Sequence, residues 1–81
     1  MEIKIVTPKI RAFLRARGLD EKWKKAQTLF EKDIRHPSLH TELMEPKDEM
    51  IYSFRVDKKY RALFVIQNGA ALVFRVTNHY C

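Results

Sequence analysis

The hydrophobic and polar positions of the chain follow two periods, and the period changes along the sequence. Residues 2–6 alternate between polar and apolar, which predicts a short strand. From residue 8 to residue 36 the apolar positions recur with the spacing of a helix face, which predicts two helices joined by a short connection. Alternation returns from residue 41 onward in runs separated by polar breaks, and these runs predict further strands.

Local signals predict where the helices begin and end. Thr7-Pro8 is typical of a helix start, because threonine caps the first free N–H groups and proline is tolerated in the first turn. Gly18 is typical of a helix end. Pro37 disfavours helical geometry in the residue before it, so we expect the second helix to end near Arg35 or His36.

The predicted order of elements, β-α-α-β-β-β(-β), defines the expected fold class. The apolar stripe of the two helices, which includes Phe13, Trp23 and Phe30, must cover one face of a sheet. We therefore expect one small α+β domain over residues 1–81, with an α-hairpin packed on one face of an antiparallel sheet.

Arginines stand inside the strand-like runs of the second half, where a cation needs an open face or a partner. We expect the larger apolar side chains to face the helices, namely Met50, Tyr52, Phe54, Val56, Leu72, Phe74 and Val76. The other face would then carry the polar side chains of Ser53, Arg55, Arg61, Arg75, Thr77 and His79. An apolar strip on that same face would consist of Leu63, Val65 and Val73.

Two hairpin loops decide whether these arginines share a face. A three-residue loop at residues 57–59 keeps Arg61 with Arg55, whereas a two-residue loop would turn it to the helices. Asn68-Gly69 is a strong signal for a tight two-residue turn. A tight turn would separate Arg61 from His79, whereas a longer loop or a bulge would keep them together, and we expect the longer loop.

The composition of the chain indicates which kind of partner it binds. The 81 residues carry 16 Lys+Arg against 10 Asp+Glu, a formal net charge of +6, which favours an anionic partner and nucleic acid first. No apolar run reaches the length of a membrane span, and the single Cys81 cannot form an internal disulfide, so the cytoplasm is the expected location. The histidines and the cysteine lack the spacing of a metal site, so we expect no metal and no cofactor.

The segment 52–64, Tyr-Ser-Phe-Arg-Val-Asp-Lys-Lys-Tyr-Arg-Ala-Leu-Phe, precedes a His79-Tyr80 pair and follows two helices. This arrangement resembles the RelE/ParE superfamily of bacterial toxins, and within it the YoeB-like branch. The element order is similar over nearly the whole chain, and the motifs are similar over residues 42–80. The resemblance implies a small sheet with two packed helices, metal-independent cleavage of mRNA on the ribosome, and an antitoxin protein that silences the toxin.

The resemblance also assigns roles to single residues. Arg61 matches the arginine that contacts the scissile phosphate, His79 the general acid, and Tyr80 the aromatic residue beside it. Further basic residues expected to contact RNA are Arg55, Arg75, Lys58 and Lys59. Arginine suits this role because its planar fork matches phosphate oxygens and its charge does not titrate away.

The general base is the least determined role. Glu42 falls at the matching position when the alignment is counted back from Ser53 without a gap, but Glu45 or Glu49 would match if the intervening turn differs in length. Phe54 replaces a basic residue that is common in the YoeB-like branch. Two alternatives to a ribonuclease follow from the same resemblance: a non-catalytic ParE-type toxin that binds DNA gyrase, and an inactive module that binds an antitoxin or RNA.

Overall fold

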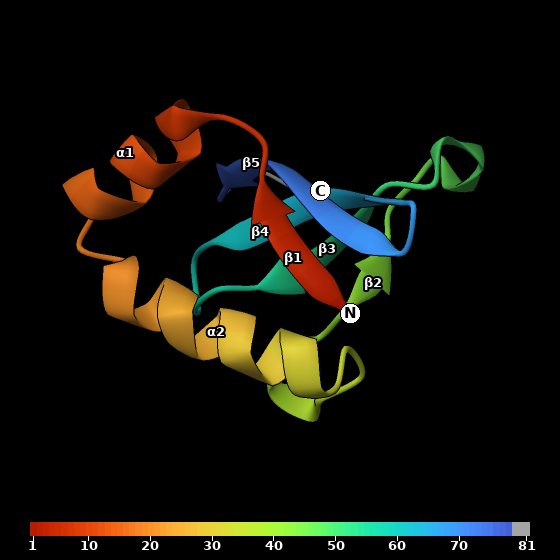
Figure 1. Ribbon diagram of the computed structural model, residues 1–81, viewed down its shortest axis with the longest axis horizontal. Helices are drawn as coiled ribbons and strands as arrows, with labels where there is room; N and C mark the ends of the chain where they lie inside the picture. The colour runs from red at the N-terminus through yellow and green to blue at the C-terminus, as the bar shows by residue number, and fades with distance from the viewer. Residues whose placement is uncertain (79–81) are drawn as a thin grey trace.

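A computed structural model describes residues 1–78, and residues 79–81 lie outside the description. The chain folds into two α-helices and a five-stranded sheet, so the predicted α+β class and element order are confirmed (Figure 1). In chain order the elements are β1 (Glu2–Ile5), α1 (Pro8–Ala16), α2 (Asp20–Lys32), the 3-10 turn η1 (Pro37–Leu39), β2 (Glu42–Leu43), the 3-10 turn η2 (Lys47–Glu49), β3 (Tyr52–Arg55), β4 (Arg61–Gln67) and β5 (Ala70–Thr77).

The first helix, α1, begins and ends as its sequence predicts. The side chain of Thr7 accepts a hydrogen bond from the Lys9 N–H at 3.1 Å, and Pro8 occupies the first helical position. The helix ends at Ala16, and Gly18 reverses the chain with a φ of 66°. The connection to α2 is therefore short, as expected for an α-hairpin.

The second helix, α2, ends at Lys32, which is earlier than the predicted end at Arg35 or His36. Asp33 adopts an extended conformation, and its Oδ1 accepts a hydrogen bond from the Arg35 N–H at 3.0 Å. An aspartate that binds nearby backbone competes with the helix for its N–H groups. The prediction was wrong here because it relied on Pro37 alone.

The strands lie side by side in the order β1-β5-β4-β3-β2. The pairs β5–β4, β4–β3 and β3–β2 are antiparallel, whereas β1 pairs with β5 in parallel. The expected antiparallel sheet is therefore extended by one parallel edge strand. This strand comes first in the chain, and α1 and α2 connect it to the rest.

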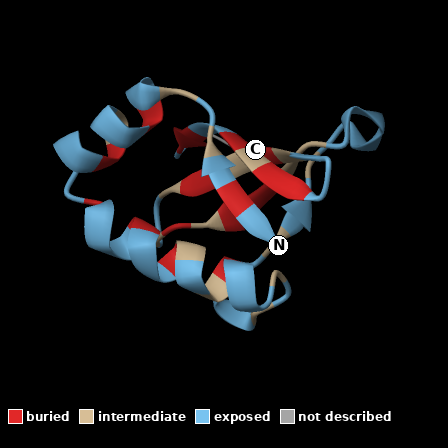
Figure 2. Ribbon diagram, in the orientation of Figure 1, coloured by how far each residue is buried: buried red, intermediate tan, exposed pale blue. Residues whose placement is uncertain are grey.

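An aromatic cluster fixes α2 to one face of the sheet. The Phe30 ring lies 5.1 Å from the Phe54 ring and 5.2 Å from the Phe64 ring, and the Trp23 ring lies 5.8 Å from that of Phe54. All four side chains are buried. Figure 2 shows the buried positions concentrated on the strands and on the inner sides of the helices. The prediction that the aromatic side chains of the third and fourth strands face the helices is confirmed.

The β3–β4 hairpin has the predicted three-residue loop. The Val56 N–H donates to the Tyr60 carbonyl at 2.9 Å, so residues 57–59 form the loop. Asp57 Oδ1 accepts hydrogen bonds from the N–H groups of Lys59 and Tyr60 at 2.9 and 2.7 Å. The aspartate thus closes the loop from inside, as aspartates in turns commonly do.

The β4–β5 hairpin differs from the expected longer loop. Asn68 and Gly69 form a two-residue turn with φ values of 53° and 76°, and Gln67 pairs directly with Ala70. A bulge then follows at Phe74, because Phe64 pairs with Val73 whereas Leu63 pairs with Arg75. The tight turn alone would direct Arg75 and Thr77 toward the helices. The extra residue of the bulge shifts the alternation by one, so both residues share a face with Arg61.

The tight turn and the bulge change which side chains of β5 face the helices. Val73 is fully buried in the core, and Phe74 is 37% exposed, so both side chains lie opposite to the prediction. Leu72 pairs with Val65 on the face away from α2. The apolar strip on this face therefore consists of Leu63, Val65 and Leu72, with Phe74 beside it, and excludes Val73.

Candidate functional site

Polar and cationic side chains gather on the face of the sheet that α2 leaves uncovered, which we call the open face. Arg55 pairs with Arg61 across β3 and β4, and Arg61 pairs with Thr77 across β4 and β5. Directly paired residues project to the same face. The predicted grouping of Arg55 and Arg61 on the face away from Trp23 and Phe30 is therefore confirmed.

Arg61 is buried, with 4% of its surface exposed. Its Nε donates to Ser53 Oγ at 3.0 Å, and its Nη2 donates to the Ser53 carbonyl at 3.3 Å and to the His40 carbonyl. Of the two possibilities for a strand cation, an open face or a partner, Arg61 therefore has partners and is buried. The segment before β2 brings the His40 carbonyl into contact with this guanidinium.

The sequence did not reveal that His40 belongs to this site or that Ser53 contacts Arg61. His40 contributes its backbone carbonyl, from a residue with a φ of 45°. Because the imidazole takes no part in this contact, the identity of the side chain gives no signal of the role. Ser53 lies on the predicted face of the sheet, where it is fully buried and binds Arg61. A polar residue between Tyr52 and Phe54 in a strand was the one available signal for such a buried contact.

Of the three candidate carboxylates, Glu42 shares a strand pairing with this site. It pairs with Ser53 across β2 and β3, so its side chain projects to the same face as those of Ser53 and Arg61. Glu45 follows β2, and Glu49 lies in η2 on the hairpin tip that extends away from the helices (Figure 1). The geometry therefore groups Glu42, rather than Glu45 or Glu49, with Arg61.

The remaining predicted basic residues surround Arg61 at different positions. Arg55 is half-buried and lines a hollow of about 240 Å³ together with Lys22 and Lys25 of α2. Arg75 is exposed and pairs with Leu63 on the open face. Lys58 and Lys59 are exposed at the loop of the β3–β4 hairpin. The predicted residues His79 and Tyr80 lie outside the described residues.

Asp57 balances part of this positive charge at the hairpin loop. Burial by itself raises the pKa of Asp57, but hydrogen bonds from the Tyr60 and Lys59 N–H groups and the Lys22 ammonium at 3.4 Å outweigh burial. The pKa of Asp57 therefore lies below its ordinary value. The Asp57 carboxylate thus keeps its negative charge at neutral pH, next to a cationic surface.

Two arginines paired directly across neighbouring strands are an unfavourable arrangement for stability alone. Like charges at such positions destabilise a sheet by up to about 1 kcal/mol. Arg55 makes no ion pair within residues 1–78, and Arg75 makes none there either. Cations held together in this way lower their mutual repulsion when an anion binds between them, so the open face is suited to bind phosphate.

The described residues offer neither a metal site nor a membrane span. Residues 1–78 contain no group of three His, Cys, Asp or Glu side chains that could hold a metal ion. Neither described helix is long and apolar enough to cross a membrane.

Comparison with known proteins gives matches in sequence and in structure. No protein-family model matches the chain. An uncharacterized protein of Haemophilus influenzae is 49% identical over 38 residues, which are 46% of this chain and 38% of that relative. The chain therefore aligns with well under half of the curated relative's length.

Two solved structures match nearly the whole chain. A copper-bound mutant toxin from Helicobacter pylori superimposes with a TM-score of 0.74 at 12% identity, covering 98% of this chain and 94% of that one. The YoeB-YefM complex from Staphylococcus aureus matches with a TM-score of 0.63 at 17% identity, covering 99% and 98%. At such identities the likeness shows the fold. The chain has a RelE/YoeB-like toxin fold, as the sequence resemblance predicted.

Proposed function

We propose that the protein is the toxin of a toxin–antitoxin pair and that it cleaves mRNA, on the ribosome and without a metal ion, so that translation stops. The observation that carries the proposal is the pairing of Arg55 with Arg61 on the open face of a RelE/YoeB-like toxin fold. Two cations at directly paired positions suit the dianionic phosphorane of RNA cleavage better than they suit a stable sheet. Such a protein acts in the cytoplasm, where ribosomes are.

The chemistry that we propose is transfer of the phosphodiester to the neighbouring 2′-hydroxyl. The Glu42 carboxylate takes the proton of the 2′-hydroxyl, and the 2′-oxygen forms a bond to phosphorus while the bond to the 5′-oxygen breaks. His79 gives a proton to the leaving 5′-oxygen, and Tyr80 stacks on a base beside the cleaved bond. The products are a 2′,3′-cyclic phosphate and a free 5′-hydroxyl.

Arg61 supplies positive charge that is already held in place. Its contacts with Ser53 and His40 support this role, because a fixed donor needs no reorganisation when charge develops on the phosphorane. Arg55 and Arg75 lie on either side at more exposed positions, which suits contacts with phosphates that arrive from solvent. Lys58 and Lys59 extend the positive surface at the hairpin loop.

An antitoxin is the proposed protein partner. The matching YoeB structure contains YefM as a second protein, which supports a partner of the same kind here. The apolar strip of Leu63, Val65 and Leu72 lies on the open face beside the cations and offers a surface for such a partner. An antitoxin segment with acidic and apolar residues would cover both.

The test is cleavage of RNA by the purified chain, with the new 5′ ends mapped in cellular mRNA and in ribosome-bound message. Arg61→Ala should lower the rate by about 10²–10³-fold, the usual cost of losing one fixed donor to a transition-state charge. Arg61→Lys should recover part of the rate if the charge matters, although lysine lacks the fork that binds Ser53 and His40. Arg11→Ala, at an exposed position of α1, removes one charge as a matched control.

The stability of each variant must be measured with its activity, because Arg61 is buried. Circular dichroism and urea unfolding show which variants are folded at the assay temperature. Full toxicity of a folded R61A variant would refute the ribonuclease proposal. Gyrase-dependent DNA breaks with intact mRNA would point instead to the non-catalytic ParE-type toxin.

A further inference from the structure

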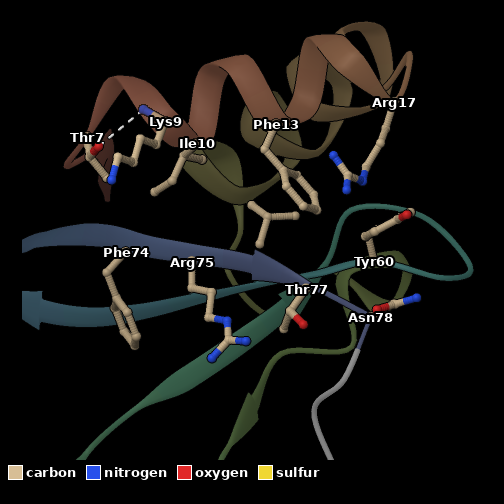
Figure 3. A pocket seen from close by; sticks show the side chains of 11 residues that line it. Thr7, Lys9, Ile10, Phe13, Arg17, Tyr60, Phe74, Arg75, Thr77 and Asn78 are labelled. Carbon is tan, nitrogen blue, oxygen red and sulfur yellow. Dashed lines mark hydrogen bonds between the residues drawn. The ribbon is translucent and has the colours of Figure 1, made fainter.

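A second hollow of about 520 Å³ lies between α1 and the C-terminal half of β5, and we call it the α1–β5 groove (Figure 3). Phe13 and Arg17 enter it from α1, and Tyr60 enters it from the β3–β4 hairpin. Arg75 and Thr77 form its rim on the side of β5 away from α1, where the open face begins. The groove therefore adjoins the proposed site.

The groove exists because β1 is shorter than β5. Strand β1 pairs with β5 from Ala70 to Val73, and the last hydrogen bond on this side joins the Val6 N–H to the Val73 carbonyl at 3.0 Å. Beyond Val73 no other strand of residues 1–78 pairs with this edge of β5. Helix α1 lies beside the edge instead, and the space between them stays open.

The charged side chains that line the groove within residues 1–78 are all cationic. They are Lys9, Arg17 and Arg75, and none of the described lining residues is an aspartate or a glutamate. None of these three cations takes part in an ion pair within the described part of the chain. Cations without counterions around a hollow favour an anionic ligand.

The groove also presents planar groups. The Arg17 guanidinium carbon lies 3.6 Å from the centroid of the Phe13 ring, and the Phe13 ring meets the Tyr60 ring edge to face at 5.8 Å. A guanidinium stacked on a phenyl ring leaves its other face for a further planar group. Unpaired RNA bases stack on aromatic rings and on arginine planes in this way.

The groove lies one strand away from Arg61. Thr77 lines the groove and pairs with Arg61 on the neighbouring strand, and paired strands lie about 4.8 Å apart. A strand of RNA whose phosphate lies near Arg61 therefore reaches the groove with its next nucleotide.

We propose that the α1–β5 groove binds the nucleotide next to the cleaved phosphodiester, with its base on the Arg17–Phe13 stack and its phosphate near Arg75. This inference rests on the proposed ribonuclease function. An acidic protein segment would meet the same charge, but it would make no use of the stacked guanidinium. The planar stack and the nearness to Arg61 therefore favour RNA.

The experiment measures binding of a short single-stranded RNA to the full chain by fluorescence anisotropy over a series of salt concentrations. A 2′-O-methyl group at the cleavage position blocks the reaction, so the RNA binds without being cut. Arg17→Gln should raise the Kd by about fivefold or more, because it removes a stacking plane and a charge. Arg75→Gln should lower the slope of log Kd against log salt by about 0.7, the value for one phosphate contact on single-stranded RNA.

Arg11→Gln is the matched control, because Arg11 is an exposed arginine of the same helix that does not line the groove. It should change the Kd less than Arg17→Gln does. A 4-thiouridine placed on either side of the cleavage position should crosslink to the peptide that contains Tyr60 from one side only. Crosslinks from neither side would contradict the proposal.

The outcomes separate this inference from the proposed function. Groove variants that bind RNA as the Arg11→Gln control does would overturn the inference, while loss of cleavage in Arg61→Ala would still support the function. Groove variants that bind RNA normally but lose an acidic peptide partner would assign the groove to a protein and overturn the inference. A wild-type chain that neither binds nor cuts RNA would refute both.

Discussion

Arg61 joins three segments that are far apart in the sequence. It lies on β4, and its guanidinium contacts Ser53 on β3 and the carbonyl of His40 before β2. A buried guanidinium is costly unless its N–H groups are satisfied. The same contacts that satisfy Arg61 also fix the direction of its charge, so stability and the proposed chemistry depend on one geometry.

Ser53 is therefore a positioning residue in the proposed reaction. Ser53→Ala removes the acceptor of the Arg61 Nε and leaves a buried donor unsatisfied, which should lower the free energy of unfolding by about 1–3 kcal/mol. A guanidinium that shifts should also lower kcat, by roughly 10²-fold for a displacement near 1 Å. Urea unfolding and single-turnover cleavage at a temperature where the variant is folded measure the two effects. A folded S53A variant with unchanged kcat would show that Ser53 serves stability only.

At the scale of elements, the two hairpins of the second half use different loops, and the loops determine the faces. The three-residue loop of residues 57–59 places Arg55 and Arg61 on one face. The tight turn at Asn68-Gly69 places Val73 in the core, and the bulge at Phe74 returns Arg75 to the open face. Without the bulge the arginine of β5 would point toward α1 and α2.

The Asp57 loop makes a prediction about pH. The pKa of Asp57 is lowered in the folded chain, so its carboxylate contributes stability that is fully present above the unfolded pKa of about 3.9 and is lost as pH falls through the folded pKa. Asp57→Ala should lower the free energy of unfolding by about 1–3 kcal/mol at pH 7, because two charge-assisted hydrogen bonds to the loop are lost.

The measurement is urea unfolding of the wild type and of Asp57→Ala between pH 7 and pH 2. The difference between them should shrink as the pH falls below about 4. Asp57→Asn keeps an acceptor oxygen but removes the charge, so comparing it with Asp57→Ala distinguishes the effect of the charge from that of the hydrogen bonds. A difference that stays constant down to pH 2 would mean that the charge of Asp57 contributes nothing to the loop.

At the scale of the whole molecule, the charges and the apolar surface are unevenly distributed. Arg55, Arg61 and Arg75 lie on the open face, and Lys9 and Arg17 line the α1–β5 groove with Arg75, whereas Glu45, Asp48 and Glu49 lie at the hairpin tip around η2. Leu63, Val65 and Leu72 form an apolar strip on β4 and β5, and Leu63 pairs directly with Arg75. A surface with one charge sign and a neighbouring apolar strip is suited to a partner that carries the opposite charge and apolar side chains.

The partner proposal predicts the effect of one substitution. Leu72→Ser should weaken binding of the antitoxin by about tenfold or more, because a half-buried leucine on the strip loses its contact. Ile66→Ser is the matched control, since Ile66 is an exposed apolar residue of β4 outside the strip. Titration calorimetry with the protein that co-purifies with the chain measures both. Equal losses for the two variants, or no loss for Leu72→Ser, would place the partner elsewhere.

Much of the fold is readable from local pattern. The helical spacing of residues 8–32, the Thr7-Pro8 start and the polar loop at residues 57–59 each depend on residues near one another in the chain. Such signals act through backbone hydrogen bonds and turn geometry over a few residues. The same pattern places arginines inside strands, where a cation needs an open face or a partner.

The tertiary structure alone decided three features: the bulge at Phe74, the burial of Arg61 and the α1–β5 groove. The tight turn at Asn68-Gly69 fixes which side chains at the start of β5 face the helices. The bulge at Phe74 then shifts the alternation by one residue, so that Val76 faces the helices and Arg75 does not. Arg61 is buried on β4, where its guanidinium contacts the carbonyl of His40, 21 residues earlier in the chain. The groove opens because β1 ends before β5 does. Each feature depends on contacts between segments that are distant in sequence, and local periodicity carries no information about such contacts.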